Sequence, residues 1–343
     1  MSDVWLPEAL SRVVAITLLS AQLTSCYLQA PIEATLSRLS DRFLRLRGLH
    51  SILHCNMASR LALPYYAPDL PSALPSEEEI ESGSDLREYC FKGRRVVAVR
   101  EHYIVKYGLD VNLLEGDNMI FVRESTNIRV PRVYALYVNS TTGNKYVVME
   151  RIRGESLQSQ WPLLQETDKQ RIIKDLQSNF IDLRKLTPPN LSYYGSLDRR
   201  PLQDMVFWTA GPDAKFNGPF DNHEEFIEAM VEKYIRDGGS IFRAEYYRQC
   251  MPQILCRCNS VFTHGDFQRK NVMIEKDQEG SGWKVTLLDW EFSGWYPSYW
   301  EYSMAFCALG KWDDDWCLHL RRVLESADSE AAWVKPIRLE MFE

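Results

Sequence analysis

Residues 261–274 read VFTHGDFQRKNVMI, and this stretch decides how the rest of the chain is interpreted. Asp266 stands five positions before Asn271, and apolar residues flank the pair on both sides. A second stretch, VTLLDWE at 285–291, ends an apolar run on the carboxylate of Asp289. An acid that can take a proton, then an amide, then a second carboxylate, is the order found in phosphoryl-transfer sites.

The spacing between the two stretches has a physical reason. Val272–Ile274 and Val285–Leu288 are short apolar runs separated by turn-forming residues at 277–282, which predicts a β-hairpin. Such a hairpin brings Asn271 beside Asp289, so that both offer oxygen ligands to one cation. Mg²⁺ commonly takes one or two protein ligands, with phosphates and water completing its shell. Under the alternative interpretation these residues are ordinary turn, capping and strand-end residues, and their order is a coincidence.

The motif His264-Gly265-Asp266 with Asn271, followed by 289–291, resembles the aminoglycoside phosphotransferase and choline kinase-like group of small-molecule kinases. Residues 294–301, GWYPSYWE, are similar to the large fungal branch of that group. The resemblance covers roughly residues 88–320. It implies an α+β, bilobal protein-kinase-like fold, with a small β-rich N-lobe and a larger, mainly helical C-lobe. It also implies ATP and Mg²⁺ as cofactors, Asp266 as catalytic base, Asn271 and Asp289 as magnesium ligands, and a loop-bracing role for His264.

Two departures from the protein-kinase pattern favour a small-molecule acceptor. Protein kinases carry arginine between the histidine and the aspartate, where this chain has Gly265. Only a short segment separates Asp289 from the helical-looking residues 302–306, and no Ala-Pro-Glu sequence occurs. The expected activity is therefore transfer of a phosphoryl group to a hydroxyl or amine of a small molecule. A nucleotide-binding pseudokinase that serves as a scaffold is the alternative, and a protein kinase is the third possibility.

The nucleotide side is predicted upstream. Val96–Val99 and Tyr103–Gly108 indicate a hairpin that turns at 100–102, and Lys106 lies where the resemblance places the phosphate-contacting lysine. A helix expected over 111–123 carries Glu115, which would hold the Lys106 ammonium over the phosphates. Glu124 is the alternative partner. Because strands alternate their faces, Lys106 facing solvent is the competing interpretation.

The adenine and phosphate contacts have weaker signals. The strand-like stretch 145–155 suggests a hinge between the lobes, with the backbone of 150–152 on the adenine edge and Met149 and Ile152 against its face; Glu150 lies at the centre of this segment. A plain edge strand explains the same residues equally well. Segment 90–95 holds a single glycine, Gly93, where protein kinases have three, and Lys92, Arg94 or Arg95 could supply charge there.

The C-terminal half has helical patterns. Thr167 with Gln170 resembles a capping box at the start of one helix, and Asn222 with Glu225 opens another. Residues 190–221 between them have no periodicity, and long irregular segments often carry function. We expect this segment to border an acceptor pocket. The aromatic residues 295, 296, 299 and 300 either line that pocket or pack the lobe, and packing is favoured.

Composition agrees with a cytoplasmic globular enzyme. The chain has 343 residues, 45% hydrophobic content and a net charge of −7, with no long Lys/Arg block, which argues against a nucleic-acid partner. Its eight cysteines are scattered and lack zinc-site spacing, so free thiols in a reducing cytosol are expected. Val13–Ala21 is apolar but too short to span a membrane.

These signals divide the chain into three parts. Residues 1–85 are interpreted as a helical extension and linker, residues 86–150 as the N-lobe, and residues 151–343 as the C-lobe with the catalytic loop and acceptor pocket. Within the extension, Ile32–Arg47 is a basic amphipathic pattern that packs on its own domain or lies on a membrane. The sequence leaves the acceptor's identity and the oligomeric state undecided.

Overall fold

The hairpin predicted around residue 100 is confirmed in a computed structural model, which describes residues 61–87, 93–277, 280, 282–310 and 312–342. Strands β2 and β3 pair antiparallel, with Val97 opposite Val105. They form one side of a five-stranded sheet in the order β1-β4-β5-β3-β2, in which each neighbouring pair is antiparallel. The strands are β1 (Tyr65–Tyr66), β2 (Arg95–Val99), β3 (Tyr103–Gly108), β4 (Val133–Val138) and β5 (Lys145–Glu150).

The two faces of this N-lobe sheet are covered by different helices. Helix α3 (Glu77–Ser82) buries Ile80 against the face that carries Tyr103, Val105 and Val148. Helix α4 (Leu114–Ser125) covers the other face and joins a core that continues into the C-lobe. Gly116 allows α4 to approach closely, because a Cβ atom there would lie 2.2 Å from a methyl carbon of Leu136. Strand alternation places Lys106 on the α4 face.

A row of tyrosine rings crosses the sheet on the α3 side. Tyr66, Tyr137, Tyr146 and Tyr107 come from β1, β4, β5 and β3, which are successive neighbours. Their ring centroids lie 6.3, 4.6 and 5.5 Å apart in that order, and each pair is stacked. The row therefore ties four of the five strands together through side chains as well as through the backbone ladder.

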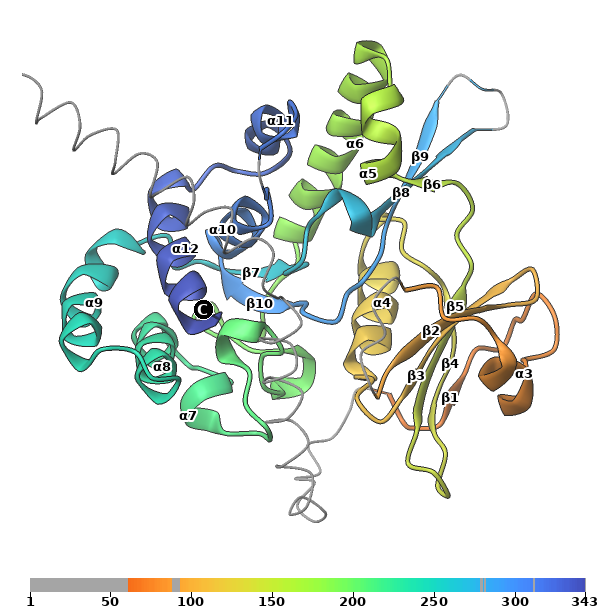
Figure 1. The fold of residues 1–343 in the computed structure, drawn as a ribbon, viewed down its shortest axis with the longest axis horizontal. Coiled ribbons are helices and arrows are strands. Elements are labelled where there is room, and N and C mark those ends of the chain that lie inside the picture. The colour runs from red at the N-terminus through yellow and green to blue at the C-terminus, as the bar shows by residue number, and fades with distance from the viewer. Residues whose placement is uncertain (1–60, 88–92, 278–279, 281, 311, 343) are drawn as a thin grey trace, which may run out of the picture. The chain divides into compact units, whose positions relative to one another are not determined.

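The C-lobe is mainly helical and holds two small sheets (Figure 1). One sheet pairs β7 with β10, and the other has the order β6-β8-β9, which includes the second predicted hairpin. The strands are β6 (Glu155–Ser156), β7 (Ser260–Thr263), β8 (Val272–Lys276), β9 (Trp283–Leu287) and β10 (Gly294–Pro297). The α-helices are α5 (Leu157–Gln160), α6 (Glu166–Arg184), α7 (Ala214–Asn217), α8 (His223–Arg236), α9 (Ile241–Ile254), α10 (Trp300–Cys307), α11 (Trp316–Val323) and α12 (Asp328–Phe342). Short 3₁₀ turns are η2 (Trp161–Leu163), η3 (Leu197–Arg199), η4 (Met205–Phe207) and η5 (Arg269–Asn271).

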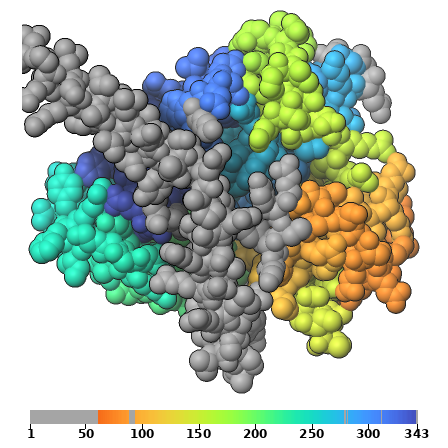
Figure 2. All heavy atoms as spheres, viewed as in Figure 1, coloured from red at the N-terminus to blue at the C-terminus, as the bar shows by residue number. Residues whose placement is uncertain are grey.

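The aromatic residues near the end of the chain form the centre of the C-lobe core. Trp290, Tyr296, Tyr299 and Trp300 are fully buried, and Trp295 nearly so. The packing interpretation of 295–300 is therefore confirmed. In the space-filling view of Figure 2, the orange and yellow surface belongs to the N-lobe sheet and its helices, and the green and blue surface to the C-lobe.

The structure differs from the sequence predictions at several element ends. Helix α6 starts at Glu166 with Gln165 as its N-cap and no side-chain cap, so the capping box predicted at Thr167 is wrong. The cap at Asn222 is confirmed, since its side chain accepts the N–H of Glu225 at 2.8 Å. The N-lobe sheet also takes in residues before 86, because β1 pairs with β4.

Some predictions fall on residues that the structure does not describe, and others concern the cysteines and membrane spans. The patterns at 13–21 and 32–47 and Lys92 lie outside the described residues. Among the described cysteines, Cys250, Cys256, Cys258, Cys307 and Cys317 are free thiols. Within the same residues, no helix has the length and apolar content that a membrane crossing requires.

Candidate active site

The loop after β7 is braced by His264, whose side chain is buried. Its Nδ1 accepts the backbone N–H of Asp266 at 3.2 Å, so the ring proton lies on Nε2, which donates to the carbonyl oxygen of Leu288 at 2.8 Å. The ring also packs on Trp290, with 4.6 Å between centroids. Both ring nitrogens are thus occupied by backbone groups, which confirms the predicted role as a brace.

The residue between His264 and Asp266 must be glycine for reasons of backbone geometry. Gly265 has φ +87°, in the region that side chains disfavour. A Cβ atom there would also lie 2.7 Å from the carbonyl oxygen of Phe292. The loop therefore passes too close to the 290–293 segment to accept a larger residue.

A buried carboxylate that the sequence analysis gave no role supports the same loop. Glu301, at the start of α10, accepts the backbone N–H of His264 at 2.6 Å and that of Gly265 at 3.3 Å. Burial raises the pKa of Glu301, while the charge of Arg184 and the backbone N–H groups of His264 and Gly265 act against that rise. A charged residue inside an aromatic run was the signal that could have identified it.

Asp266 lies at the open side of the loop, with its side chain 19% exposed. Its Oδ2 accepts from the Asn271 amide nitrogen at 2.8 Å, and its Oδ1 accepts from Gln268. The Lys270 ammonium lies 3.9 Å from Oδ2. These donors fix the orientation of the carboxylate, which a general base requires.

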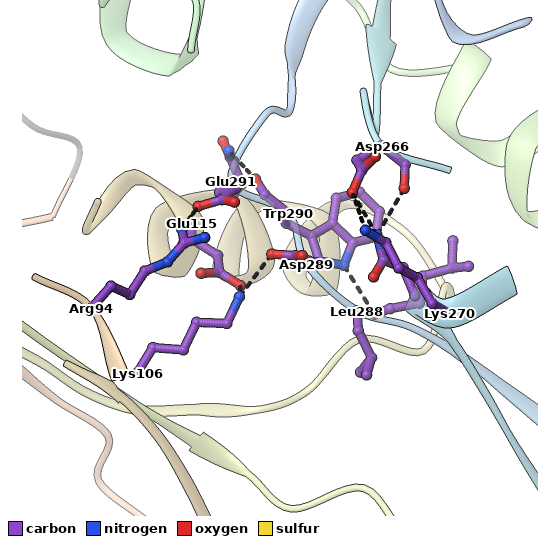
Figure 3. Close-up of polar contacts among 12 residues, drawn as sticks. Arg94, Lys106, Glu115, Asp266, Lys270, Leu288, Asp289, Trp290 and Glu291 are labelled. Carbon is purple, nitrogen blue, oxygen red and sulfur yellow. Dashed lines mark hydrogen bonds and ion pairs between the residues drawn. The ribbon is translucent and has the colours of Figure 1, made fainter. Parts of the chain in front are cut away.

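Asn271 and Asp289 come together in the main chain, while their side chains have different partners. The Leu288 N–H donates to the Asn271 carbonyl oxygen at 2.8 Å, as expected from the hairpin. The Asn271 amide nitrogen, however, also donates to the Asp266 carbonyl oxygen at 2.9 Å. Asp289 instead faces Lys106, as Figure 3 shows. That Asn271 and Asp289 hold a common magnesium ion stays a prediction.

Lys106 joins the two lobes at the candidate site. Its Nζ lies 2.6 Å from Glu115 Oε1 and 2.7 Å from Asp289 Oδ1. The predicted ion pair with Glu115 is therefore present, and Glu124 is not the partner. Burial lowers the pKa of Lys106, but the nearby carboxylates of Asp289 and Glu115 outweigh it, so the pKa is raised overall. Lys106 is thus held as a cation.

The site holds more negative than positive charge. Glu115, Asp289 and Glu291 each offer an oxygen within 4.8 Å of the other two, and Lys106 and Arg94 are the described cations that face them. Burial raises the pKa of Glu115 to about 7, although Lys106 opposes the rise. Hard carboxylate oxygens in excess over cations suit Mg²⁺, so the donor set fits that ion.

Asp289 adopts a backbone conformation that is uncommon for its residue type. Its φ is +65°, two residues after β9 ends at Leu287. A non-glycine residue in this region carries strain, and such strain concentrates at functional sites. The turn directs the Asp289 carboxylate toward Lys106.

A second cation reaches the same carboxylates from the loop before β2. Arg94 forms an ion pair with Glu291, a residue 197 positions away. The side chains of Arg94 and Lys106 both extend toward the carboxylate group in Figure 3. Of the three cations proposed for this loop, Arg95 lies elsewhere, since it donates to the Tyr107 hydroxyl at 2.6 Å.

Helix α4, which carries Glu115, is fixed to the C-lobe by two polar contacts. Asn118 donates its amide to the Trp290 carbonyl oxygen at 2.8 Å. The Arg200 guanidinium lies 2.6 Å from the buried carboxylate of Asp117. Both contacts join α4 to distant parts of the chain, and neither follows from a sequence pattern.

The predicted hinge has some backbone groups already in use. The N–H of Glu150 donates to the Arg132 carbonyl oxygen at 2.8 Å, and that of Arg151 to His102 at 2.9 Å. The Glu150 carboxylate accepts the Arg132 N–H at 3.1 Å, and Met149 is buried. The N–H groups of Glu150 and Arg151 are therefore already used within the protein. Adenine contacts by Glu150 and Ile152 stay a prediction, and they would have to use other backbone groups.

A family model described as the phosphotransferase enzyme family (APH) matches residues 112–336. Among solved structures, apo aminoglycoside phosphotransferase APH(4)-Ia, a thermostable mutant, is 16% identical, with 77% of this chain and 86% of that chain covered and a TM-score of 0.48. The GDP complex of wild-type aminoglycoside 2'-phosphotransferase-IIIa is 12% identical, with 76% and 83% covered and a TM-score of 0.48. Curated proteins give no match to this chain.

Proposed function

Because the chain belongs to the APH phosphotransferase enzyme family, we propose that it transfers the γ-phosphoryl group of ATP to a hydroxyl or amine of a small molecule. The contact between Lys106 and Asp289, 183 positions apart, carries this proposal. It joins a cation from the N-lobe sheet to a carboxylate of the C-lobe, in the same site as the loop of Asp266. A triphosphate and its metal ion need these two charges side by side.

The free thiols of the described cysteines support a reducing compartment, the cytoplasm.

In the proposed mechanism the residues of the chain mainly position and neutralise the reactants. Asp266 accepts the proton of the acceptor hydroxyl or amine while the acceptor atom forms a bond to the γ-phosphorus. The bond from that phosphorus to the β–γ bridging oxygen breaks, and ADP leaves. Lys106, fixed by Glu115, orients the phosphates, and Met149, Glu150 and Ile152 border the adenine. Most of the rate comes from positioning and charge neutralisation.

Asp289 and Asn271 would hold Mg²⁺, with Glu291 and Glu115 as neighbouring oxygen donors. The ion supplies charge neutralisation on the phosphate oxygens. The excess of carboxylates over cations at the site supports this assignment. Asp289→Ala should therefore lower magnesium-dependent ATP binding, since the variant removes a carboxylate proposed to hold the ion, 2.7 Å from the Lys106 ammonium.

Replacement of the proposed base tests the function directly. We expect Asp266→Ala to reduce transfer from ATP to a small-molecule metabolite extract by about 10²–10⁴-fold, because a general base contributes that much. ATP affinity should stay within a factor of about three, since Asp266 contacts the acceptor in this mechanism. Radiolabelled γ-phosphate followed into the metabolite fraction measures transfer. Asp69→Asn, at a side chain that is 82% exposed, is the control.

The other outcomes separate the alternative functions. A fully active Asp266→Ala variant would remove Asp266 as the base. Magnesium-dependent ATP binding by the parent with no transfer to any metabolite would favour a nucleotide-binding scaffold. Label that enters protein in place of the metabolite fraction would favour a protein kinase.

A further inference from the structure

The described part of the segment that precedes β2 offers one glycine, where protein kinases have three. Gly93 is its described glycine, with φ +100°. Its carbonyl oxygen accepts the Asp110 N–H at 3.0 Å, and a Cβ atom at Gly108 would lie 2.2 Å from that oxygen. The conformational freedom of Gly93 thus serves its packing against β3. A nucleotide at this site needs another source of positive charge on this side.

Arg94 is placed to supply that charge. Its main chain is held because the Arg87 guanidinium, which is itself paired with Asp85 at 2.7 Å, donates to the Arg94 carbonyl oxygen. The side chain is 30% exposed and reaches the carboxylate group of Glu115, Asp289 and Glu291. Burial lowers the pKa of Arg94, but Glu291 and Asp289 outweigh it and raise the pKa overall. Arg94 therefore stays protonated beside the carboxylates, and its side chain is partly open to solvent.

Arg95, the neighbouring residue, provides a natural contrast. It has the same charge and the next position in the chain, yet its Nη1 lies 3.0 Å from the Glu81 carbonyl oxygen, and its Nη2 lies 2.5 Å from that of Gly83. Strand alternation turns it toward α3, away from the carboxylates. Of these two neighbouring arginines, Arg94 therefore has the side chain that points toward the carboxylates.

We propose that Arg94 binds the β- and γ-phosphates of ATP and gives up Glu291 when it does so. This inference rests on the proposed function. A guanidinium matches phosphate oxygens with two parallel hydrogen bonds, so the exchange keeps the arginine paired. Glu291, once released, lies beside Asp289 and Glu115, where a divalent cation compensates its charge. Nucleotide binding and metal binding are coupled through this one residue.

The test is a comparison of nucleotide affinities by isothermal titration calorimetry. Parent, Arg94→Gln, Arg94→Lys and Arg95→Gln proteins are titrated with ATP and with AMP in the presence of Mg²⁺. We expect Arg94→Gln to weaken ATP binding by about 10- to 100-fold, which is the range for a lost charge-assisted hydrogen bond. Arg94→Lys should recover part of this loss, AMP affinity should be unchanged, and Arg95→Gln should bind like the parent. Equal melting temperatures of the Arg94 variants and the parent establish that each variant is folded.

A second measurement tests the exchange with Glu291. Glu291→Gln removes repulsion of ATP in any background, but it also frees Arg94 in the parent. In the absence of Mg²⁺, its gain in ATP affinity should therefore be larger in the parent than in the Arg94→Gln background. Equal gains in both backgrounds would overturn the exchange.

The possible failures can be told apart. Parent-like ATP affinity of Arg94→Gln, beside measurable binding by the parent, would overturn the role of Arg94 and leave the proposed function standing. A parent protein that binds no nucleotide would overturn both.

Discussion

At the scale of single residues, two positions with positive φ shape the candidate active site. Gly265 lets the catalytic loop pass against Phe292, and Asp289 turns its carboxylate toward Lys106. Gly265 has no room for a side chain, and Asp289 has a strained backbone conformation. Neither requirement is encoded in local propensity, since a glycine and an aspartate are both common in ordinary turns.

Replacement of Gly265 should be costly because its side-chain space is filled by backbone. We expect Gly265→Ala to lower the free energy of unfolding by about 2 to 4 kcal/mol, from strained φ and a forced shift of the 290–293 segment. Gly238→Ala is the matched control, since Gly238 has φ +102° with no atom within 4 Å of the added Cβ. It should lose about 1 kcal/mol. Urea denaturation measures both, and equal losses would contradict the close approach at Phe292.

At the scale of elements, α4 connects the N-lobe sheet to the segment that carries Asp289. Its Glu115 contacts Lys106 on β3, and its Asn118 contacts the backbone beside Asp289. The helix therefore positions the lysine relative to the C-lobe carboxylates. The contact between Arg200 and Asp117 adds a second anchor on the same helix.

Removal of that anchor should cost a buried carboxylate a charge-assisted hydrogen bond. Asp117 is 4% exposed, so we expect Arg200→Gln to cost about 2 to 3 kcal/mol of unfolding free energy. The adjacent pair, Arg199 with Asp221, is exposed on both sides, and Arg199→Gln should cost less than about 1 kcal/mol. Thermal denaturation compares the two variants, and a similar small loss for both would show that Arg200 is not an anchor of α4.

Local patterns predicted much of the fold and only part of the site. The hairpins β2–β3 and β8–β9 and the cap at Asn222 follow from runs, turns and spacing that lie close together in the sequence. The Arg94 pair with Glu291 spans 197 positions, and no local pattern specifies which distant atoms meet. Strand β1 has two residues, too few for any periodicity. The start of α6 was misplaced because Thr167 is a better capping residue than Gln165.

At the scale of the whole molecule, stability should depend on a partly buried, neutral histidine. Burial lowers the pKa of His223 to about 4, and its Nε2 lies 3.0 Å from the Tyr299 hydroxyl. Its ordinary pKa is 6.5, so between pH 6.5 and 4 the unfolded chain binds more protons than the folded one. Stability from this group is complete above pH 6.5 and is lost as the pH falls toward 4.

His223→Gln should therefore flatten the acid side of the stability profile. We expect the parent to lose about 2 to 3 kcal/mol more than the variant between pH 6.5 and 4. The raised pKa of Glu115 has the opposite effect on stability, which it increases as the pH falls from 7 to 4.5. Both proteins carry Glu115, so this effect cancels when their stabilities are subtracted. Melting temperatures at matched ionic strength provide the measurement. Parallel profiles would mean that His223 is not the acid-sensitive group.

The row of four tyrosines also bears on the position of Lys106, although the rings lie on the opposite face of the sheet. Tyr107 follows Lys106 directly on β3, so the two residues point to opposite faces of the sheet. If β3 slipped by one residue, Lys106 would leave the α4 side, and the ring of Tyr107 would at the same moment abandon Tyr146. Stacking of the tyrosine rings on the α3 face therefore helps to keep Lys106 in line with Glu115 and Asp289.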